Sequence, residues 1–198
     1  MRRLLLARHG ESEWNASGRW QGRADPPLTP LGRKQAMLAV DNLGTVDAIV
    51  SSTLQRAAET ALIISEGLGV GPVLFDEDLV ERDAGEWQGL TRAEIEAAWP
   101  GYLANQLRPP SYELDEPLVE RVLVALDRVC ASVPGDHILV ITHGGVINAL
   151  ERSMGLEWQR IPNLGGRWFA WKEGTLHLGD RVELIDHAVV TIQDRDQL

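Results

Sequence analysis

The chain has little of what disulfide-bonded and membrane-embedded proteins require. Cys130 is the single cysteine among 198 residues, so no intramolecular disulfide can form, which fits a reducing compartment. It falls in the apolar stripe of an expected helix, which predicts a small core residue rather than a nucleophile. No apolar run approaches a membrane span, and the run after Arg2-Arg3 is only four residues long, too short for the core of a signal peptide. We therefore expect a cytoplasmic protein with no membrane partner.

Positive charge is also scarce. The 19 Lys and Arg residues against 29 Asp and Glu give a net charge of −10, which argues against a nucleic-acid partner. The distribution is uneven, because residues 1–56 carry 8 basic against 5 acidic residues and the remaining 142 carry 11 against 24. A locally basic beginning in an acidic protein fits a small anion site.

Closely spaced metal ligands are missing as well. Four of the five histidines lie in the second half of the chain, and their spacing forms none of the short ligand pairs of a zinc site; these are His137, His143, His177 and His187. We therefore expect no metal and no cofactor. For His137, His177 and His187 the pattern favours ordinary strand-edge or surface positions.

Strand-like and helix-like patterns alternate along the chain, which predicts an α/β fold with helices on both faces of a mostly parallel sheet. Expected strands cover residues 3–8, 47–50, 73–75 and 137–142, and expected helices about 29–44, 53–66, 91–100 and 117–132. A polar loop is expected over residues 10–27, and short strand-like runs over 168–171, 175–178 and 182–185. Without a convincing linker or repeat, residues 1–198 are interpreted as a single domain, a three-layer α/β/α sandwich.

Two of the buried strands end in histidine-glycine turns. Arg8-His9-Gly10-Glu11 follows the first strand, and His143-Gly144-Gly145 follows the strand over residues 137–142. Open α/β sheets bind ligands at the carboxyl ends of their strands, where these side chains would lie. Neutral histidine is a nucleophile near pH 7, arginine offers a planar fork to phosphate oxygens, and open N–H groups at a helix start can hold an anion.

Other segments place suitable chemistry at the ends of elements. Arg56 falls in the first turn of a helix, where the helix dipole favours an anion, and a carboxyl at Glu81 can exchange protons with a substrate oxygen. Tryptophans in the same loops, Trp14, Trp20 and Trp87, can wall a pocket, whereas Trp99 and Trp158 are expected to be packing residues.

These motifs, in their order along the chain, resemble the histidine phosphatase superfamily, which includes the cofactor-dependent phosphoglycerate mutases. The resemblance is to the small, broad-specificity phosphatases of that superfamily and covers most of residues 3–150. The matching segments are Arg8-His9-Gly10-Glu11, Trp14-Asn15, Gly18-Arg19, Gln21-Gly22, Asp25-Pro26-Pro27-Leu28-Thr29, Gly32, Gln35-Ala36, Ser51-Ser52, Arg56-Ala57, Thr60-Ala61, Leu79, Glu81, Gly85, Trp87, Gly89-Leu90 and Thr142-His143-Gly144-Gly145.

The resemblance implies a metal-independent phosphatase of small phosphomonoesters. His9 would be the nucleophile and form a phosphohistidine, and Glu81 would protonate the leaving oxygen and then accept a proton from water. A cationic His143 would surround the phosphoryl group together with Arg8 and Arg56. Further phosphate or substrate contacts would come from Asn15, Gln21, Gly22 and Gly144.

The sequence is also compatible with alternative functions. A cofactor-dependent phosphoglycerate mutase shares the phosphohistidine, but in the resembling family it uses extra polypeptide between the glutamate loop and the second histidine. Here about 60 residues separate Glu81 from His143, which favours hydrolysis. A phosphoprotein phosphatase or a non-catalytic module that binds phosphorylated ligands is the third possibility. The expected partner is a small phosphorylated metabolite, and a homodimer is left open.

Overall fold

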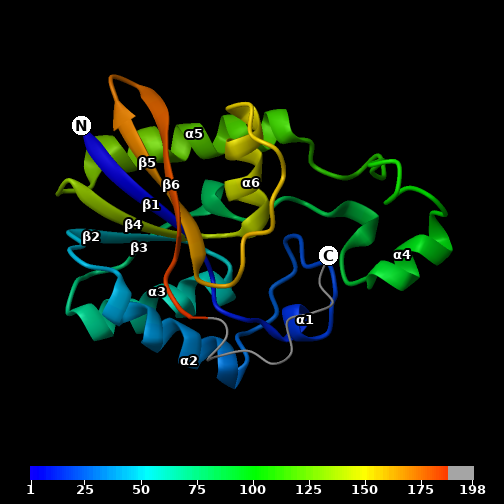
Figure 1. The fold of residues 1–198 in the computed structure, drawn as a ribbon, viewed down its shortest axis with the longest axis horizontal. Coiled ribbons are helices and arrows are strands. Elements are labelled where there is room, and N and C mark those ends of the chain that lie inside the picture. Colours follow the sequence, from blue (N-terminus) through cyan, green and yellow to red (C-terminus); the bar gives the residue numbers. More distant parts are fainter. Residues whose placement is uncertain (187–198) are drawn as a thin grey trace.

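The computed structural model describes residues 1–186, and its centre is a six-stranded sheet in the order β3-β2-β4-β1-β5-β6 (Figure 1). Four strands are parallel: β1 (Arg2–Arg8), β2 (Ala48–Ser52), β3 (Leu74–Asp76) and β4 (His137–Thr142). The antiparallel pair β5 (Gly165–Lys172) and β6 (Thr175–Glu183) extends the sheet beyond β1. The predicted mostly parallel sheet is confirmed.

Helices cover both faces of this sheet (Figure 1). One face carries α2 (Pro30–Ala39) and α3 (Gln55–Leu68), and the other carries α5 (Asp115–Ser132) and α6 (Gly144–Ser153). The remaining helical segments are short: α1 (Glu13–Ala16), α4 (Arg92–Ala98), η1 (Val40–Asn42), η2 (Glu77–Leu79) and η3 (Gly85–Trp87). The predicted three-layer arrangement is therefore confirmed.

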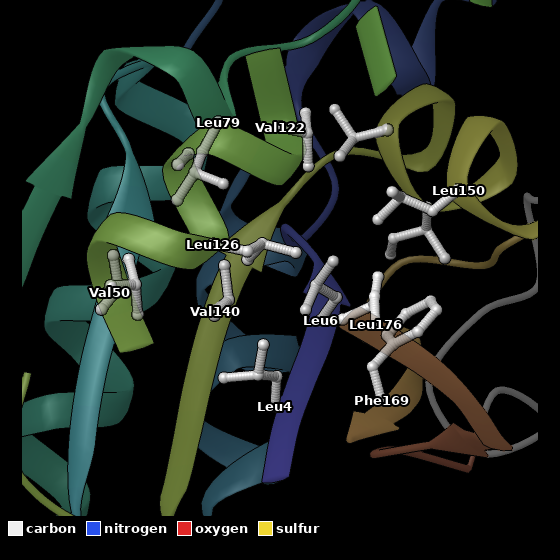
Figure 2. Close-up of a cluster of buried hydrophobic side chains, with 14 of the residues drawn as sticks. Leu4, Leu6, Val50, Leu79, Val122, Leu126, Val140, Leu150, Phe169 and Leu176 are labelled. Atoms are coloured by element: carbon white, nitrogen blue, oxygen red, sulfur yellow. The ribbon is translucent and has the colours of Figure 1, made fainter. Parts of the chain in front are cut away.

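Alternate side chains of β1 pack into two separate hydrophobic clusters, one on each face of the sheet. Leu4 and Leu6 point into the cluster under α5 and α6, where Figure 2 shows them beside Val140 of β4 and Leu126 of α5. Leu5 and Ala7 belong to the opposite cluster under α2 and α3, as the two-residue period of a strand requires. Because each buried leucine stabilises the fold by about 1.5–3 kcal/mol, β1 is fixed at the centre of the sheet.

Local capping signals set where several helices begin. Thr29 accepts a hydrogen bond from the Gly32 amide at the start of α2, and Thr91 forms a capping box with Glu94 at the start of α4. Both starts agree with the sequence. The expected loop over residues 10–27 was wrong in one respect, because it contains the single turn α1, capped by Ser12. A single turn is too short to have a helical period.

The last strands also differ from expectation. The predicted runs over 175–178 and 182–185 are not separate, since β6 is continuous from Thr175 to Glu183 and passes through Gly179. A Cβ at position 179 would lie 2.7 Å from the Trp168 carbonyl oxygen, and the register with β5 shifts nearby, between Arg167 and Phe169. The glycine therefore reflects close approach of two backbones at an irregular pairing rather than the end of a strand.

Three expectations for single side chains have different outcomes. Cys130 is buried as expected. Trp158 is 53% exposed, so the expectation that it is a packing residue was wrong; it follows α6 in a segment without regular structure. His187 lies outside the described residues.

Within residues 1–186, no helix combines the length and the apolar character that crossing a bilayer demands.

Candidate active site

The two histidine turns meet because β1 and β4 are parallel neighbours. Arg8 pairs with Thr142 at the ends of these strands, so the next residues, His9 and His143, lie side by side with ring centroids 5.2 Å apart. Both rings are buried, with exposed fractions of 2% and 0%. This is the predicted position of the site, at the carboxyl edge of the parallel strands.

The His9 ring is held in one tautomer. Its Nδ1 lies 2.6 Å from the Gly10 carbonyl oxygen, which can only accept, so Nδ1 carries the proton. Nε2 then has a free electron pair, and the Arg56 Nε donates to it at 3.2 Å. Burial, followed by the charges of Arg56 and Arg8, lowers the pKa of His9 well below 6.5. A neutral imidazole with Nε2 unprotonated is the form that can attack phosphorus.

Arg56 is a fully buried cation at the start of α3. Its Nη1 donates to the Ala24 carbonyl at 2.7 Å and its Nη2 to the Gly22 carbonyl at 3.0 Å. Burial lowers its pKa to about 10, which still leaves it charged at neutral pH. Gly22 has φ +51°, and a Cβ there would lie 2.8 Å from Ala84 Cβ. The carbonyl of Gly22 thus helps to orient Arg56, a role that its sequence motif did not indicate.

Arg8 and Gly144 lie together at the start of α6. The Arg8 Nη1 donates to the Ile161 carbonyl at 2.8 Å, and its Cδ would lie 3.5 Å from a Cβ at position 144. Gly144 is the first residue of α6, where main-chain N–H groups have no partner within the helix. A guanidinium and a helix N-terminus therefore adjoin the two histidines, and both favour an anion.

The Glu81 carboxylate is held by two main-chain donors, one at the start of α6 and one in its own loop. Its Oε2 accepts from the Gly145 amide at 3.1 Å and its Oε1 from the Arg82 amide at 2.8 Å. A Cβ at position 145 would lie 2.3 Å from Oε1, so the close approach of the carboxylate requires glycine there. Its charge raises the pKa of Arg56, partly offsetting the effect of burial.

His143 differs in charge from what its expected role requires. Its Nε2 lies 2.8 Å from the Ser52 hydroxyl, and within residues 1–186 its buried Nδ1 has no hydrogen-bond partner. Burial, then the charges of Arg56, His9, Arg8 and Arg121, lower its pKa well below 6.5. The ring is therefore neutral at pH 7 in this arrangement. A cationic His143 needs a nearby anion that offsets the surrounding positive charge.

Two amide side chains have their oxygens occupied by protein donors. The Asn15 Oδ1 accepts from the Ser12 main-chain N–H at 3.2 Å, and the Gln21 Oε1 accepts from the Ser12 hydroxyl at 2.7 Å. Because an amide side chain has one oxygen and one nitrogen, these bonds leave the NH₂ groups to donate. Both predicted residues can thus supply donors to an anionic ligand.

Asn163 is a site residue that the sequence did not reveal. It is 1% exposed, and its Nδ2 donates to the His9 carbonyl at 3.0 Å and to the Asn15 Oδ1 at 3.2 Å. It therefore fixes both the backbone of His9, the predicted nucleophile, and the side chain of Asn15, a predicted phosphate ligand. It lies between α6 and β5 in a segment without a motif, so no sequence signal marks it.

Two of the three tryptophans expected to wall the pocket, Trp20 and Trp87, belong to a packed aromatic cluster. Trp87 is fully buried, with its ring centroid 5.0 Å from that of Trp20 and 5.8 Å from that of Tyr112. The Arg108 guanidinium lies over both the Trp87 and Tyr112 rings, at 5.3 Å and 5.5 Å from their centroids.

Among residues 1–186, no group of three or more His, Cys, Asp or Glu side chains could hold a metal ion.

A model of the histidine phosphatase superfamily (branch 1) matches residues 4–174. The chain belongs to this family. It is 35% identical over 181 residues to a glucosyl-3-phosphoglycerate phosphatase of Mycolicibacterium vanbaalenii, covering 84% of this chain and 80% of that protein. It is 36% identical over 195 residues to a metal-independent phosphoserine phosphatase of Arabidopsis thaliana, covering 92% of this chain and 79% of the relative.

The fold agrees with a solved member of the same superfamily. The structure of mycobacterial glucosyl-3-phosphoglycerate phosphatase in complex with VO3 matches with a TM-score of 0.80 and 30% identity, over 89% of this chain and 96% of that chain. The predicted family, fold class and phosphatase activity are therefore confirmed, and this histidine phosphatase is a phosphomonoesterase.

Acid is expected to destabilise this phosphatase through its two buried histidines. Their pKa values lie well below 6.5 in the folded protein, chiefly because of burial, whereas the unfolded chain titrates near the ordinary value. Below about pH 6.5 the unfolded state therefore binds more protons. The stabilising contribution is fully present above that pH and is lost as the pH falls toward the folded values, at up to about 1.4 kcal/mol per pH unit for each histidine.

Urea unfolding between about pH 7.5 and about pH 5.5 measures this dependence. The His9→Gln and His143→Gln variants are each expected to show a shallower fall in the free energy of unfolding than the wild type. A fall of the same steepness in all three proteins would contradict the assignment of the effect to these two rings.

Proposed function

We propose that this histidine phosphatase hydrolyses small phosphomonoesters through a phosphohistidine on His9. The observation that carries the proposal is the His9 ring, with Nδ1 held by the Gly10 carbonyl and Nε2 beside the Arg56 guanidinium. In the first step Nε2 forms a bond to phosphorus while the bond from phosphorus to the ester oxygen breaks. Arg8 and Arg56 offset the charge on the phosphoryl oxygens, and Asn15, Gln21 and Gly144 donate hydrogen bonds to them.

Glu81 handles the protons in both steps of the proposed reaction. The Glu81 carboxylate first takes up a proton as the substrate binds, and then gives that proton to the departing ester oxygen, which leaves as an alcohol. The resulting carboxylate then takes a proton from a water molecule as that water attacks the phosphohistidine. The second step releases inorganic phosphate and restores both neutral His9 and protonated Glu81.

His143 is proposed to change its charge when a phosphate group is bound. The substrate brings negative charge beside the Nδ1 and Nε2 atoms, which offsets the cations that lower the pKa of this ring. A protonated His143 would then donate to a phosphoryl oxygen. The same reasoning supports a reaction without a metal ion, because two guanidinium groups already supply positive charge and would repel a divalent cation.

Hydrolysis is favoured over transfer to a second hydroxyl by what lies between Glu81 and His143. About half of this stretch is α4, α5 and β4, and the last two belong to the sheet core. Only the other half is left to cover the site and exclude water from the phosphohistidine. We also place the enzyme in the cytoplasm, on the strength of its single cysteine.

The substrate class follows from the relatives and is tested by a panel of phosphomonoesters. The relatives' names point to glucosyl-3-phosphoglycerate and phosphoserine, both of which carry a carboxylate. Phosphate release is measured with a chelator present, on each ester beside a counterpart without the carboxylate, such as phosphoethanolamine for phosphoserine. We expect release without added metal and faster release from carboxylated esters.

Each arm of this panel has a clear contrary result. Release that stops with chelator and returns with a divalent cation would contradict a metal-independent reaction. Equal rates for carboxylated and plain esters would contradict the narrower substrate class and leave the chemistry of His9 in place. Isomerisation of phosphoglycerate without release of phosphate would identify a mutase.

A further inference from the structure

The backbone around Glu81 is held by one side chain from α5. Arg121 donates through Nη1 to the carbonyl oxygens of Asp78 and Val80, at 2.6 Å and 2.9 Å. Its Nη2 donates to the Glu81 carbonyl at 3.2 Å. Residues 80–84 lie outside helices and strands, so these bonds replace the ladder that regular structure would provide. The Arg121 side chain is only 15% exposed, which strengthens such bonds.

The same guanidinium is fixed by a carboxylate that reaches the other side of Glu81. Arg121 Nε and Nη2 donate to the two Glu113 carboxylate oxygens at 2.8 Å and 3.0 Å. Glu113 Oε2 also accepts from the Asp83 amide at 2.9 Å, and the Glu113 amide donates to the Asp83 carbonyl at 3.0 Å. Arg121 and Glu113 together therefore hold the chain before and after Glu81.

This arrangement reaches the reactive carboxyl through a single peptide plane. The Glu81 carbonyl and the Arg82 amide belong to the same rigid peptide group. Arg121 Nη2 donates to the carbonyl oxygen of that peptide group. The N–H of the same group, which belongs to Arg82, donates to Glu81 Oε1 at 2.8 Å. The orientation that Arg121 imposes on the plane thus sets the direction of a hydrogen bond to the carboxyl. The second oxygen is held independently, by the Gly145 amide.

We propose that Arg121 is a positioning residue that holds the carboxyl of Glu81 at the place where it exchanges a proton with the leaving oxygen. The inference rests on the proposed role of Glu81 as proton donor. Lysine cannot replace Arg121 fully, because its ammonium group lacks the planar fork that binds a carboxylate and several carbonyls at once. A misplaced carboxyl slows the reaction most where the leaving oxygen needs a proton.

Arg128 offers a matched control on the same helix. It lies two turns after Arg121 and also joins α5 to the segment before Glu81, donating to the carboxylates of Asp76 and Asp78 at 2.8–3.0 Å. Its partners precede the glutamate loop, and its side chain is 49% exposed. Removing Arg128 thus loosens the same pair of elements without releasing the carbonyls of Val80 and Glu81.

The test compares an aryl phosphate, whose phenolate leaves without a proton, with an alkyl phosphate such as glycerol phosphate. We expect Arg121→Gln to lower kcat on the alkyl ester by about 10- to 100-fold more than on the aryl ester, with little change in KM. Arg121→Lys should show the same preference to a smaller degree, and Arg128→Gln should affect both esters equally. In a Glu81→Gln background, Arg121→Gln should produce no further preference.

The outcomes separate the two claims. If Glu81→Gln lowers kcat more on the alkyl ester than on the aryl ester and Arg121→Gln does not, the positioning role alone is overturned. Absence of discrimination in Glu81→Gln itself overturns the proton-donor role and the inference with it. Thermal unfolding of every variant identifies loss of folded protein, and if Arg121→Gln does not fold, Arg121→Lys is judged by the same criterion.

Discussion

Replacement of His9 by alanine is expected to reduce kcat on every phosphomonoester by on the order of a millionfold, the scale seen when an enzyme loses its nucleophile. The physical reason is that no other group is arranged in the same way. His9 Nε2 is an unprotonated ring nitrogen whose tautomer is set by the Gly10 carbonyl and whose neighbour is a fully buried guanidinium. Its neighbour His143 keeps its Nε2 at the Ser52 hydroxyl instead.

The measurement is rapid mixing with a radiolabelled aryl phosphate, followed by denaturation in alkali, where phosphohistidine survives, and in acid, where it does not. Wild type should retain label in alkali and lose it in acid, and His9→Ala should retain none under either condition. His177→Ala is the control, because His177 is exposed on the edge strand β6. Label that persists in His9→Ala would move the nucleophile to another residue.

Much of this site could be predicted because its parts follow buried strands directly. Once β1 and β4 are recognised as apolar strands of a parallel sheet, the residues after them must meet at one edge, and His9 and His143 do so. The capped starts of α2 and α4 could be predicted equally well, since Thr29 and Thr91 accept hydrogen bonds from amides only three residues away. Local patterns and the order of the strands therefore suffice to predict where the candidate site lies.

The supporting contacts could not be predicted, because they join distant parts of the chain through ordinary side chains. Asn163 reaches His9 across 154 positions, and Arg121 reaches the Glu81 loop across about 40. In the sequence, neither differs from a surface residue of the same type. The neutral state of His143 has a related cause: it depends on complete burial and on several cations from separate elements, which only the folded arrangement brings together.

Substitution of Glu81 by glutamine is expected to have the second largest effect, slowing alkyl phosphates by about 10²- to 10⁴-fold and aryl phosphates much less. A glutamine oxygen can still accept from the Gly145 amide, as Oε2 does now. Its NH₂ group, however, would face the Arg82 amide in place of Oε1, donor against donor. The variant keeps the size of the side chain and loses both the transferable proton and one of its two holding bonds.

The measurement is kcat for a series of esters whose leaving alcohols differ in acidity, with Glu86→Gln as the control. Glu86 lies in the same loop region and is exposed, with its carboxylate bonded to the Ser111 hydroxyl. Wild type and Glu86→Gln should show a weak dependence on the acidity of the alcohol, because protonation offsets a poor leaving group. Glu81→Gln should show a steep one. A parallel decrease across the whole series would mean that Glu81 acts through its charge on Arg56, and the proton would have to come from another group.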